Sequence, residues 1–329
     1  MIITQTPLRI SFLGGGTDLQ EFYSVEDGFV ISTTIDKYIY IIINERFDDL
    51  IYINYTNKER VSSPIEIKHD LVREALLKTG VSKGIEITML ADIPSEGSGL
   101  GSSSSLLIGL LNALYIFKGE QVTAERLASE ACEIEIGKCG KPIGKQDQYI
   151  AAYGGLCSIT FKSDESVDVK KIHISDRDRI LFGNELMLFY TGITRKSADI
   201  LTEQKNNTHN KFKELKNIKI LAQKAESLLS NNKFEQIGVL LNDNWISKKK
   251  LASKIANPVI DNMYKRAMDA GALGGKISGA GGGGFMLLYT KSENQNKVRE
   301  ALAQYKEMPF FLESDGSKVI FNYKKYSWK

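Results

Sequence analysis

The residues with the clearest potential for chemistry lie in a loop that is rich in glycine and serine. The stretch PSEGSGLGSSSSLLIG covers residues 94–109, and it contains the start of an apolar run that predicts a helix to about residue 117. Glycines allow positive φ angles and close approach of a ligand to the backbone. Successive N–H groups and the positive end of a helix dipole attract anions. The loop therefore predicts a phosphate-binding site, in which serine hydroxyls could bind phosphate oxygens or a magnesium ion.

The spacing of these residues excludes two common phosphate loops. A Walker A loop requires GxxxxGK[ST], and the chain contains no such string. The dinucleotide fingerprint GxGxxG fails because Gly97 and Gly99 would require glycine at position 102, where serine stands. A serine-capped helix after a flexible loop stays open as an alternative, although a cap needs one serine and residues 102–105 are all serine.

A second stretch, PLRISFLGGGTDL at residues 7–19, ends a strand-like run in three glycines. Arg9 on the strand and Asp18 beyond the turn could both face a ligand. A carboxylate accepts several hydrogen bonds, which suits the hydroxyls of a sugar. The alternative is a glycine turn in which Thr17 or Asp18 caps a helix.

Two further stretches complete the set. KISGAGGGGF at residues 276–285 has more glycines than a tight turn requires, which favours close approach to a ligand. The stretch 133–149 contains Asp147, expected in a loop, where its carboxylate could take a proton from a hydroxyl nucleophile. Glu135, on the preceding helix, could hold a metal ion. Each of these acids could instead be a solubilising surface residue.

Taken in this order, the four stretches resemble the GHMP kinase superfamily, of the galactokinase, homoserine kinase, mevalonate kinase and phosphomevalonate kinase type. The segment from Pro94 to Ser103 corresponds to the central motif, and GKQDQY corresponds to the segment with the catalytic aspartate. The four motifs span residues 7–285, and together they are far more specific than the central motif alone. The resemblance implies an α+β fold of two domains, the first like ribosomal protein S5 domain 2 and the second ferredoxin-like. ATP and a sugar would meet between them.

The resemblance also implies roles for individual residues. Asp147 would be the base, and Arg9 would stabilise charge near the transferred phosphoryl group. Lys145 departs from the pattern of galactokinase-type relatives, and as a cation two residues from Asp147 it could lower the pKa of Asp147 or contact a substrate phosphate. For Arg9, a structural ion pair with Asp147 or Asp18 is the alternative. Mg²⁺ would be bound by Ser103 and Glu135, with Glu133 as the fallback. The residues expected to bind ATP are Glu96, Gly97, Ser98, Gly99, Leu100, Gly101, Ser102, Ser103 and Ser104. The residues expected to bind the substrate are Gly15, Gly16, Thr17, Asp18, Asp147, Gly192, Thr194, Arg195, Lys196, Gly281 and Gly282.

Three strings, PLRISFLGGGTD, GKPIGKQDQYIAAYGG and FYTGITRKSADIL, are similar to one branch of the superfamily. That branch phosphorylates the anomeric C1 hydroxyl of D-glycero-D-manno-heptose 7-phosphate to the 1,7-bisphosphate, on the way to GDP-heptose and surface polysaccharide. The segment TGITRKS, residues 191–197, would bind the 7-phosphate, or else be a plain helix start with solvated cations. L-Fucose kinases carry similar strings, so L-fucose or another small sugar stays open as the substrate. A non-catalytic sugar and nucleotide sensor is a more distant alternative.

Hydrophobic patterning divides the chain into two halves. Before about residue 180 we expect mainly strands, with helices at 66–79 and 123–136 and a helix that follows the glycine- and serine-rich loop to about residue 117. Later residues predict a strand at 186–192, a strand after the third glycine stretch, and a late helix and strand. The long helices of this half are expected at 195–207, 210–229, 233–251 and 258–270. We therefore predict an ATP-binding N-terminal domain, 1–180, and a C-terminal domain, 181–329.

Composition excludes several classes of function. The 329 residues are 42% hydrophobic, an ordinary value for a globular protein. Their net charge is only +3, and this balance of acidic and basic residues does not indicate nucleic acid or an anionic membrane as a partner. The basic run 248–250 is expected to be a solvated helix face. Three cysteines without a CxxC pair indicate a reducing compartment and no zinc site. With no basic leader and no apolar run long enough for a bilayer, we expect a cytoplasmic protein, with a homodimer as a candidate assembly.

Overall fold

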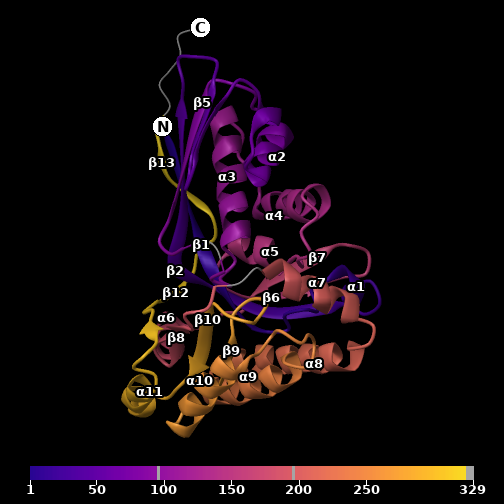
Figure 1. Ribbon diagram of the computed structural model, residues 1–329, viewed down its shortest axis with the longest axis vertical. Helices are drawn as coiled ribbons and strands as arrows, with labels where there is room; N and C mark the ends of the chain where they lie inside the picture. The colour runs from indigo at the N-terminus through magenta and orange to yellow at the C-terminus, as the bar shows by residue number, and fades with distance from the viewer. Residues whose placement is uncertain (95–96, 195–196, 324–329) are drawn as a thin grey trace.

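The computed structural model describes residues 1–94, 97–194 and 197–323. Two sheets organise the chain, which confirms the predicted α+β class (Figure 1). The larger sheet has nine strands in the order β13-β1-β2-β5-β3-β4, and β6 and β12 pair with β2 while β7 pairs with β6. Its strands are β1 (Ile2–Leu13), β2 (Gly28–Glu45), β3 (Ile51–Asn54), β4 (Lys58–Val61), β5 (Ile85–Ala91), β6 (Leu156–Phe161), β7 (Val167–Lys171), β12 (Leu312–Glu313) and β13 (Lys318–Asn322).

The two longest strands, β1 and β2, form the spine of the molecule. They pair antiparallel along their length, and the register shifts between Pro7 and Leu8 and again between Ser11 and Leu13. Such bulges bend a strand and re-aim the side chains beside them. As a result the pair curves from the upper part of the molecule to its lower part (Figure 1), and the end of β1 reaches the second half of the chain.

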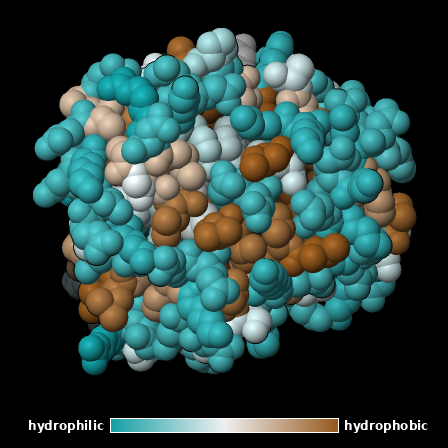
Figure 2. Space-filling view, turned by 90° about the horizontal axis from the view of Figure 1, so that it is seen from below, coloured by the Kyte–Doolittle hydropathy of each residue, from teal (hydrophilic) through white to brown (hydrophobic). Residues whose placement is uncertain are grey.

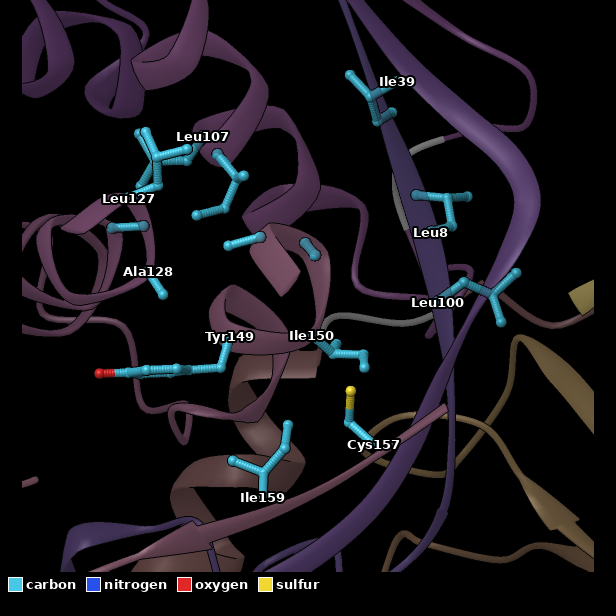
Figure 3. Close-up of a cluster of buried hydrophobic side chains, with 14 of the residues drawn as sticks. Leu8, Ile39, Leu100, Leu107, Leu127, Ala128, Tyr149, Ile150, Cys157 and Ile159 are labelled. Atoms are coloured by element: carbon cyan, nitrogen blue, oxygen red, sulfur yellow. The ribbon is translucent and has the colours of Figure 1, made fainter. Parts of the chain in front are cut away.

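Helices cover one face of the large sheet. The central one, α3 (Ser102–Lys118), is buried along most of its length, and it is flanked by α2 (Asp70–Thr79), α4 (Ala124–Cys132) and α5 (Gln146–Tyr153). Figure 3 shows Leu107, Leu127 and Ile150 of these helices and Leu8 and Ile39 of the sheet in one cluster of buried apolar side chains. This core fixes the starts of α3 and α5, which both carry predicted site residues.

The second half of the chain forms a four-stranded antiparallel sheet in the order β11-β8-β10-β9. Its strands are β8 (Leu186–Tyr190), β9 (Gly274–Ile277), β10 (Phe285–Tyr289) and β11 (Lys306–Glu307). The helices around it are α6 (Asp176–Asn184), α7 (Ser197–Asn207), α8 (Phe212–Ser230), α9 (Phe234–Lys248), α10 (Pro258–Asp269) and α11 (Gln295–Ala301). The start of α10 is encoded locally, since the Asn257 side chain accepts a hydrogen bond from the N–H of Ile260 and proline occupies the first turn.

Several expectations about elements are corrected by the structure. Asp147 lies in the first turn of α5 and not in a loop. In place of one helix at 123–136, the chain forms the α-helix α4, which ends at Cys132, and then a π-helix at Glu133–Lys138. A domain boundary at residue 180 leaves out the last two strands of the larger sheet, because β12 pairs with β2 and β13 pairs with β1. Long-range pairing of short strands leaves little local signal in the sequence.

The underside of the molecule, where α8, α9 and α10 lie, has an uneven surface. Figure 2 shows apolar residues gathered near the middle of this face and hydrophilic residues around them. These helices carry half-exposed apolar side chains, among them Ile220, Val239, Ile246 and Val259. Surfaces of this kind are where protein contacts are expected, and the homodimer stays a prediction. Among the described residues, no helix is long and apolar enough to cross a bilayer.

Adjacent leucines of α2 test the packing of the helical layer. Leu76 is 0% exposed and Leu77 is 47% exposed. We expect Leu76→Ala to lower the free energy of unfolding by about 2–5 kcal/mol, because the lost side chain leaves a cavity. Leu77→Ala, the matched control, should change it by less than about 0.5 kcal/mol. Urea unfolding monitored by circular dichroism measures both, and equal losses would contradict this packing.

Candidate active site

The glycine- and serine-rich loop has the geometry of an anion cradle. Gly97, Gly99 and Gly101 have φ angles of +72°, +74° and +77°, which only glycine adopts easily. Gly101 is the N-cap residue of α3, so the free N–H groups of the first helical turn follow directly on the loop. Positive φ at alternate positions curls the backbone around a concavity, and the helix dipole adds to its attraction for anions.

The two largest glycine loops contact each other through their backbones. A Cβ atom on Gly99 would lie 2.5 Å from the carbonyl oxygen of Ser278, and one on Gly284 would lie 2.5 Å from that of Ser98. These contacts, and not only a ligand, explain why the stretch 276–285 is so rich in glycine. Gly281 and Gly282, predicted to bind substrate, pack instead against Ile255, whose carbonyl accepts a hydrogen bond from the N–H of Gly282 at 2.7 Å.

A cavity, here called the outer cavity, lies beside the loop and has a volume of about 380 Å³. It is bounded by the loop, the start of α3, the π-helix, α5, α7 and the third glycine loop. Its lining residues are Arg9, Gly97, Ser98, Gly99, Gly101, Ser102, Ser103, Ser104, Glu135, Lys141, Pro142, Ile143, Asp147, Ala198, Leu201, Gly279 and Ala280. Of the residues predicted to bind ATP, Leu100 is absent from this wall because its side chain is 0% exposed in the core.

Glu135 is the centre of a polar cluster at the end of the outer cavity. Its carboxylate is 0% exposed and accepts hydrogen bonds from the hydroxyls of Ser103 and Ser104, both at 2.6 Å. The amide of Gln148 also donates to it at 2.7 Å, and the ammonium of Lys141 lies 3.3 Å away. π-helical segments often occur at functional sites, and here the segment turns this carboxylate toward the loop.

The donor set of this cluster fits Mg²⁺. A buried carboxylate and an adjacent hydroxyl are hard oxygen ligands, and the Lys141 ammonium, which also donates to Ser103 at 2.9 Å, shows that a cation is accommodated there. Among the described residues no group of three or more histidine, cysteine, aspartate or glutamate side chains could hold a metal. Glu133, the fallback ligand, turns away and pairs with Lys78 at 2.5 Å.

Arg9 and Asp147 form a two-pronged ion pair. The Nε and Nη2 atoms of Arg9 donate to the two carboxylate oxygens of Asp147 at 2.7 and 2.6 Å. Nη1 of Arg9 donates to the carbonyl of Gly99 at 2.6 Å. Arg9 is 4% exposed, whereas the Asp147 side chain is 23% exposed. The guanidinium therefore fixes the orientation of a carboxylate that stays accessible, and it ties that carboxylate to the phosphate-type loop.

A second cavity, here called the inner cavity, adjoins the first and has a volume of about 70 Å³. Its lining residues are Arg9, Ser11, Gly15, Gly16, Asp18, Ile143, Gly144, Gln146, Asp147, Leu201, Gln204, Lys248, Lys276, Gly279 and Ala280. The Asp18 carboxylate accepts hydrogen bonds from the N–H groups of Gly16 at 2.9 Å and Gln146 at 3.3 Å. Burial, and to a lesser degree the charge of Asp147, raise the pKa of Asp18 above its usual value.

Arg9 and Asp147 line both cavities, which is the central feature of the site. On one side lies a glycine- and serine-lined cradle suited to phosphates. On the other lies an enclosed space with the Asp18 carboxylate. A carboxylate at the junction of the two is placed to act on a hydroxyl group in the inner cavity that faces a phosphoryl group in the outer one.

Two of the predicted site residues have structural roles. Thr17 is 0% exposed, and its hydroxyl donates to the carbonyl of Gly14 at 2.8 Å and accepts from the N–H of Phe29 at 3.0 Å, so it holds the turn and not a ligand. Lys145 does not face Asp147. Its ammonium pairs with Glu165 and lies 4.8 Å from the ring centre of Tyr23. Lys145, which was expected to act on Asp147, is thus ion-paired with Glu165.

The segment 191–197 only partly belongs to the described structure. Gly192 and Thr194 are exposed and line neither cavity, and the Thr194 hydroxyl bonds to that of Tyr190 at 2.8 Å. Arg195 and Lys196, and likewise Glu96 of the phosphate-type loop, lie outside the described residues. Residues of α7 that follow this segment do line both cavities, namely Leu201, and with it Ala198 in the outer and Gln204 in the inner cavity.

Two lysines of the inner cavity have no counterpart in the sequence-based site. Lys276 is the first residue of the third glycine stretch, and the prediction for that stretch depended on its glycines. Lys248 was expected on a solvated helix face, yet it is 5% exposed. A signal was available, because Leu241 and Trp245, both 0% exposed, precede Lys248 at a helical spacing that points to one buried face.

Comparison with known proteins identifies the family. The chain matches the model of the GHMP kinases N terminal domain over residues 67–155 and that of the GHMP kinases C terminal over residues 225–307. It is 31% identical to the D-glycero-alpha-D-manno-heptose 7-phosphate kinase of Campylobacter jejuni, over 92% of this chain and 93% of that protein. The chain therefore belongs to the GHMP kinase family, and it is a sugar kinase of that family.

More distant relatives and solved structures agree with this family. The bifunctional fucokinase/GDP-fucose pyrophosphorylase of Arabidopsis thaliana is 23% identical over 98% of this chain and 32% of that protein. A crystal structure of a putative sugar kinase from Campylobacter jejuni is 28% identical, with a TM-score of 0.77 and coverage of 97% of both chains. A D-glycero-D-manno-heptose 1-phosphate kinase from Bacteroides thetaiotaomicron has a TM-score of 0.82 over 98% of this chain and 100% of that one, and at 24% identity it shows the shared fold.

Replacing Gly99 tests the contact between the two glycine loops. In Gly99→Ala the new methyl group would lie 2.5 Å from the carbonyl oxygen of Ser278, at a φ of +74°. We expect the loop to shift and ATP to bind at least about tenfold more weakly, since about 1.4 kcal/mol suffices for that change. Gly137→Ala, at a position with no atom within 4 Å of the added group, is the matched control. Isothermal titration with ATP compares them, and unchanged affinity in Gly99→Ala would contradict the contact.

Proposed function

We propose that this kinase phosphorylates the anomeric C1 hydroxyl of D-glycero-D-manno-heptose 7-phosphate, with ATP as donor, to give the 1,7-bisphosphate for GDP-heptose synthesis. The observation that carries the chemistry is the position of Arg9 and Asp147 at the junction of the outer and inner cavities. The similarity to the Campylobacter jejuni heptose 7-phosphate kinase supports the choice of substrate.

The reaction assigns one task to each side of the junction. In the outer cavity, the loop 97–104 binds the ATP phosphates through backbone N–H groups and serine hydroxyls. In the inner cavity, Asp18 accepts hydrogen bonds from sugar hydroxyls. Asp147 takes the proton of the C1 hydroxyl as its oxygen bonds to the γ-phosphorus, the bond from that phosphorus to the bridging oxygen breaks, and ADP leaves. An anomeric hydroxyl is more acidic than an ordinary alcohol, so a carboxylate suffices as the base.

The remaining charges would be neutralised by residues around the loop. Arg9 pairs with Asp147 and donates to the Gly99 carbonyl, so the guanidinium would lie beside the transferred phosphoryl group and stabilise its charge. Ser103 and Glu135 would hold Mg²⁺, which supplies charge neutralisation at the ATP phosphates when bound. Lys141, which contacts both ligand residues, would then turn to a phosphate oxygen.

A coupled assay of ADP release tests the substrate. With MgATP, we expect turnover of D-glycero-D-manno-heptose 7-phosphate with a specificity constant far above those for L-fucose, galactose and mevalonate, and with product phosphorylated at C1. Preference for L-fucose would contradict the proposed substrate but would agree with a sugar kinase. ATP binding without turnover of any compound in the panel would favour the sensor.

Substitution of Asp147 tests its role as base. We expect Asp147→Asn to lower kcat by about 10²–10⁴-fold, because the amide cannot take the proton. Asp168→Asn, on an exposed carboxylate paired with Lys162, is the matched control and should leave kcat unchanged. Steady-state kinetics gives kcat, and titration with ATP checks that the site remains intact. An unchanged kcat with Asp147→Asn would remove this residue from the mechanism.

A further inference from the structure

The turn after β1 contains three consecutive glycines, and they are not glycine for the same reason. Gly14 and Gly16 have φ angles of +90° and +103°, and a Cβ atom on Gly14 would lie 2.0 Å from the carbonyl oxygen of Phe29. Backbone conformation and close packing therefore explain these two. Gly15 has no positive φ angle, and among the described residues the atoms nearest to an added Cβ lie at 3.6 and 3.7 Å, which are ordinary contact distances. The surrounding protein thus gives no reason for its missing side chain.

Gly15 lines the inner cavity together with Ser11 of β1 and Gln146 of α5. The two atoms nearest to its absent Cβ belong to these residues. They are the hydroxyl oxygen of Ser11, 3.6 Å from the Cβ position, and the side-chain nitrogen of Gln146, 3.7 Å from it. Two polar groups therefore converge on the space that a larger residue at position 15 would fill.

The same two side chains have buried atoms without a hydrogen-bond partner. Ser11 is 4% exposed, and its hydroxyl has no partner among the described residues. The side-chain oxygen of Gln146 has none either. Such atoms are uncommon in native proteins, and each requires an explanation. The other described atoms of this kind do not line the inner cavity, and they belong to His69, Gln148, Asn244, Trp245, Ser278 and Thr290. Two unpaired groups on one small space indicate a ligand there.

The backbones that carry these two side chains are held in place. The ammonium of Lys276 donates to the carbonyls of Ser11 at 2.7 Å and Phe12 at 3.2 Å, which fixes the end of β1. The N–H of Gln146 donates to the carboxylate of Asp18 at 3.3 Å, which fixes the start of α5. The hydroxyl and the amide are therefore positioned before a ligand binds, and this lowers the entropic cost of binding.

The hydrogen-bonding capacity of the unpaired atoms defines the kind of ligand. The side-chain oxygen of Gln146 only accepts, so its partner must be a donor, which excludes an ionised phosphate or an ether oxygen at that atom. The hydroxyl of Ser11 can both donate and accept. A hydroxyl group between them would donate to Gln146 and accept from Ser11, and both atoms would then be satisfied.

The position beside the reacting groups defines which hydroxyl this is. Ser11 lies two residues after Arg9 on β1, and Gln146 directly precedes Asp147 on α5. All four line the inner cavity, whose volume is only about 70 Å³. Since Asp147 would act on the C1 hydroxyl, the ligand group lies next to C1. Of the two ring atoms bonded to an anomeric carbon, the ring oxygen has no proton to donate, whereas C2 carries a hydroxyl.

We propose that Ser11, Gly15 and Gln146 form a subsite for the C2 hydroxyl of the sugar, for which Gly15 leaves the space. This inference rests on the proposed function insofar as the phosphorylated hydroxyl is that of C1. A site with buried polar groups rejects a ligand that lacks the matching hydroxyl, because those groups then stay unpaired. The subsite therefore makes the kinase selective against 2-deoxy sugars.

Kinetics with paired substrates tests the subsite. For D-glycero-D-manno-heptose 7-phosphate we expect Ser11→Ala and Gln146→Met each to lower kcat/KM about tenfold, in keeping with the loss of one hydrogen bond. For the 2-deoxy analogue the wild-type value should itself be at least about tenfold lower, and neither variant should lower it further. KM for ATP should stay unchanged. Ser11→Ala removes a hydroxyl without a partner, so its folding is not at risk.

A methyl group at position 15 tests the space. Gly15→Ala is compatible with the fold, because the methyl group would make only ordinary contacts with described residues, yet it would stand where the hydroxyl binds. We expect KM for the heptose 7-phosphate to rise at least about tenfold, and KM for ATP to stay unchanged. Gly137→Ala, at a position with no atom within 4 Å of the added group, is the matched control.

Three results would overturn the subsite. Equal losses for the heptose 7-phosphate and its 2-deoxy analogue would mean that the variants disturb the cavity as a whole. No loss in Ser11→Ala and Gln146→Met would mean that an ordered water satisfies both groups. An unchanged KM for the sugar in Gly15→Ala would show that no part of the substrate occupies that space.

The same comparison separates this inference from the choice of substrate. If L-fucose is the sugar that is turned over, the proposed substrate fails, and the measurement is repeated with L-fucose and 2-deoxy-L-fucose. A loss confined to L-fucose supports the subsite, and equal losses overturn it. If no sugar is turned over, isothermal titration of both pairs into the enzyme saturated with a non-hydrolysable ATP analogue gives the comparison, and absence of binding by every sugar overturns the subsite.

Discussion

The ion pair between Arg9 and Asp147 is the interaction on which the arrangement of the site depends. It connects β1 to the first turn of α5, and the remaining guanidinium donor reaches the carbonyl of Gly99 in the phosphate-type loop. Because Arg9 is almost fully buried, loss of its partner would leave an uncompensated charge inside the protein. The same contact that stabilises the N-terminal half therefore holds a carboxylate at the point where two cavities meet.

A second constraint on the site is the close contact between the backbones of two glycine loops. The third glycine loop lies against the first, with carbonyls of Ser98 and Ser278 where side chains would otherwise be. The small sheet is thus fitted to the large one at the cradle itself, and the outer cavity is bounded by both. Residues of α7 complete the walls. The outer cavity is therefore lined by residues of both halves of the chain.

The distribution of charge separates the tasks of the two cavities. Hydroxyls, glycine N–H groups and the buried Glu135 surround the outer one, which suits nucleotide phosphates with a bound cation. Asp18, Lys248 and Lys276 line the inner one, together with the Arg9–Asp147 ion pair, and the Asp18 carboxylate suits the hydroxyls of a sugar.

The sequence by itself determined the α+β class, most of the long helices and strands, and the four motifs, because periodicity and glycine spacing are local properties. It also predicted Arg9, Asp18, Asp147, Ser103 and Glu135, which the structure brings to the two cavities. Only tertiary structure decided that Lys145 pairs with Glu165, that Thr17 holds a turn and that β13 returns to β1. The same is true of Lys276, since the direction of its side chain depends on packing between segments far apart in the chain, whereas the burial of Lys248 had a local signal in its helical spacing from Leu241 and Trp245.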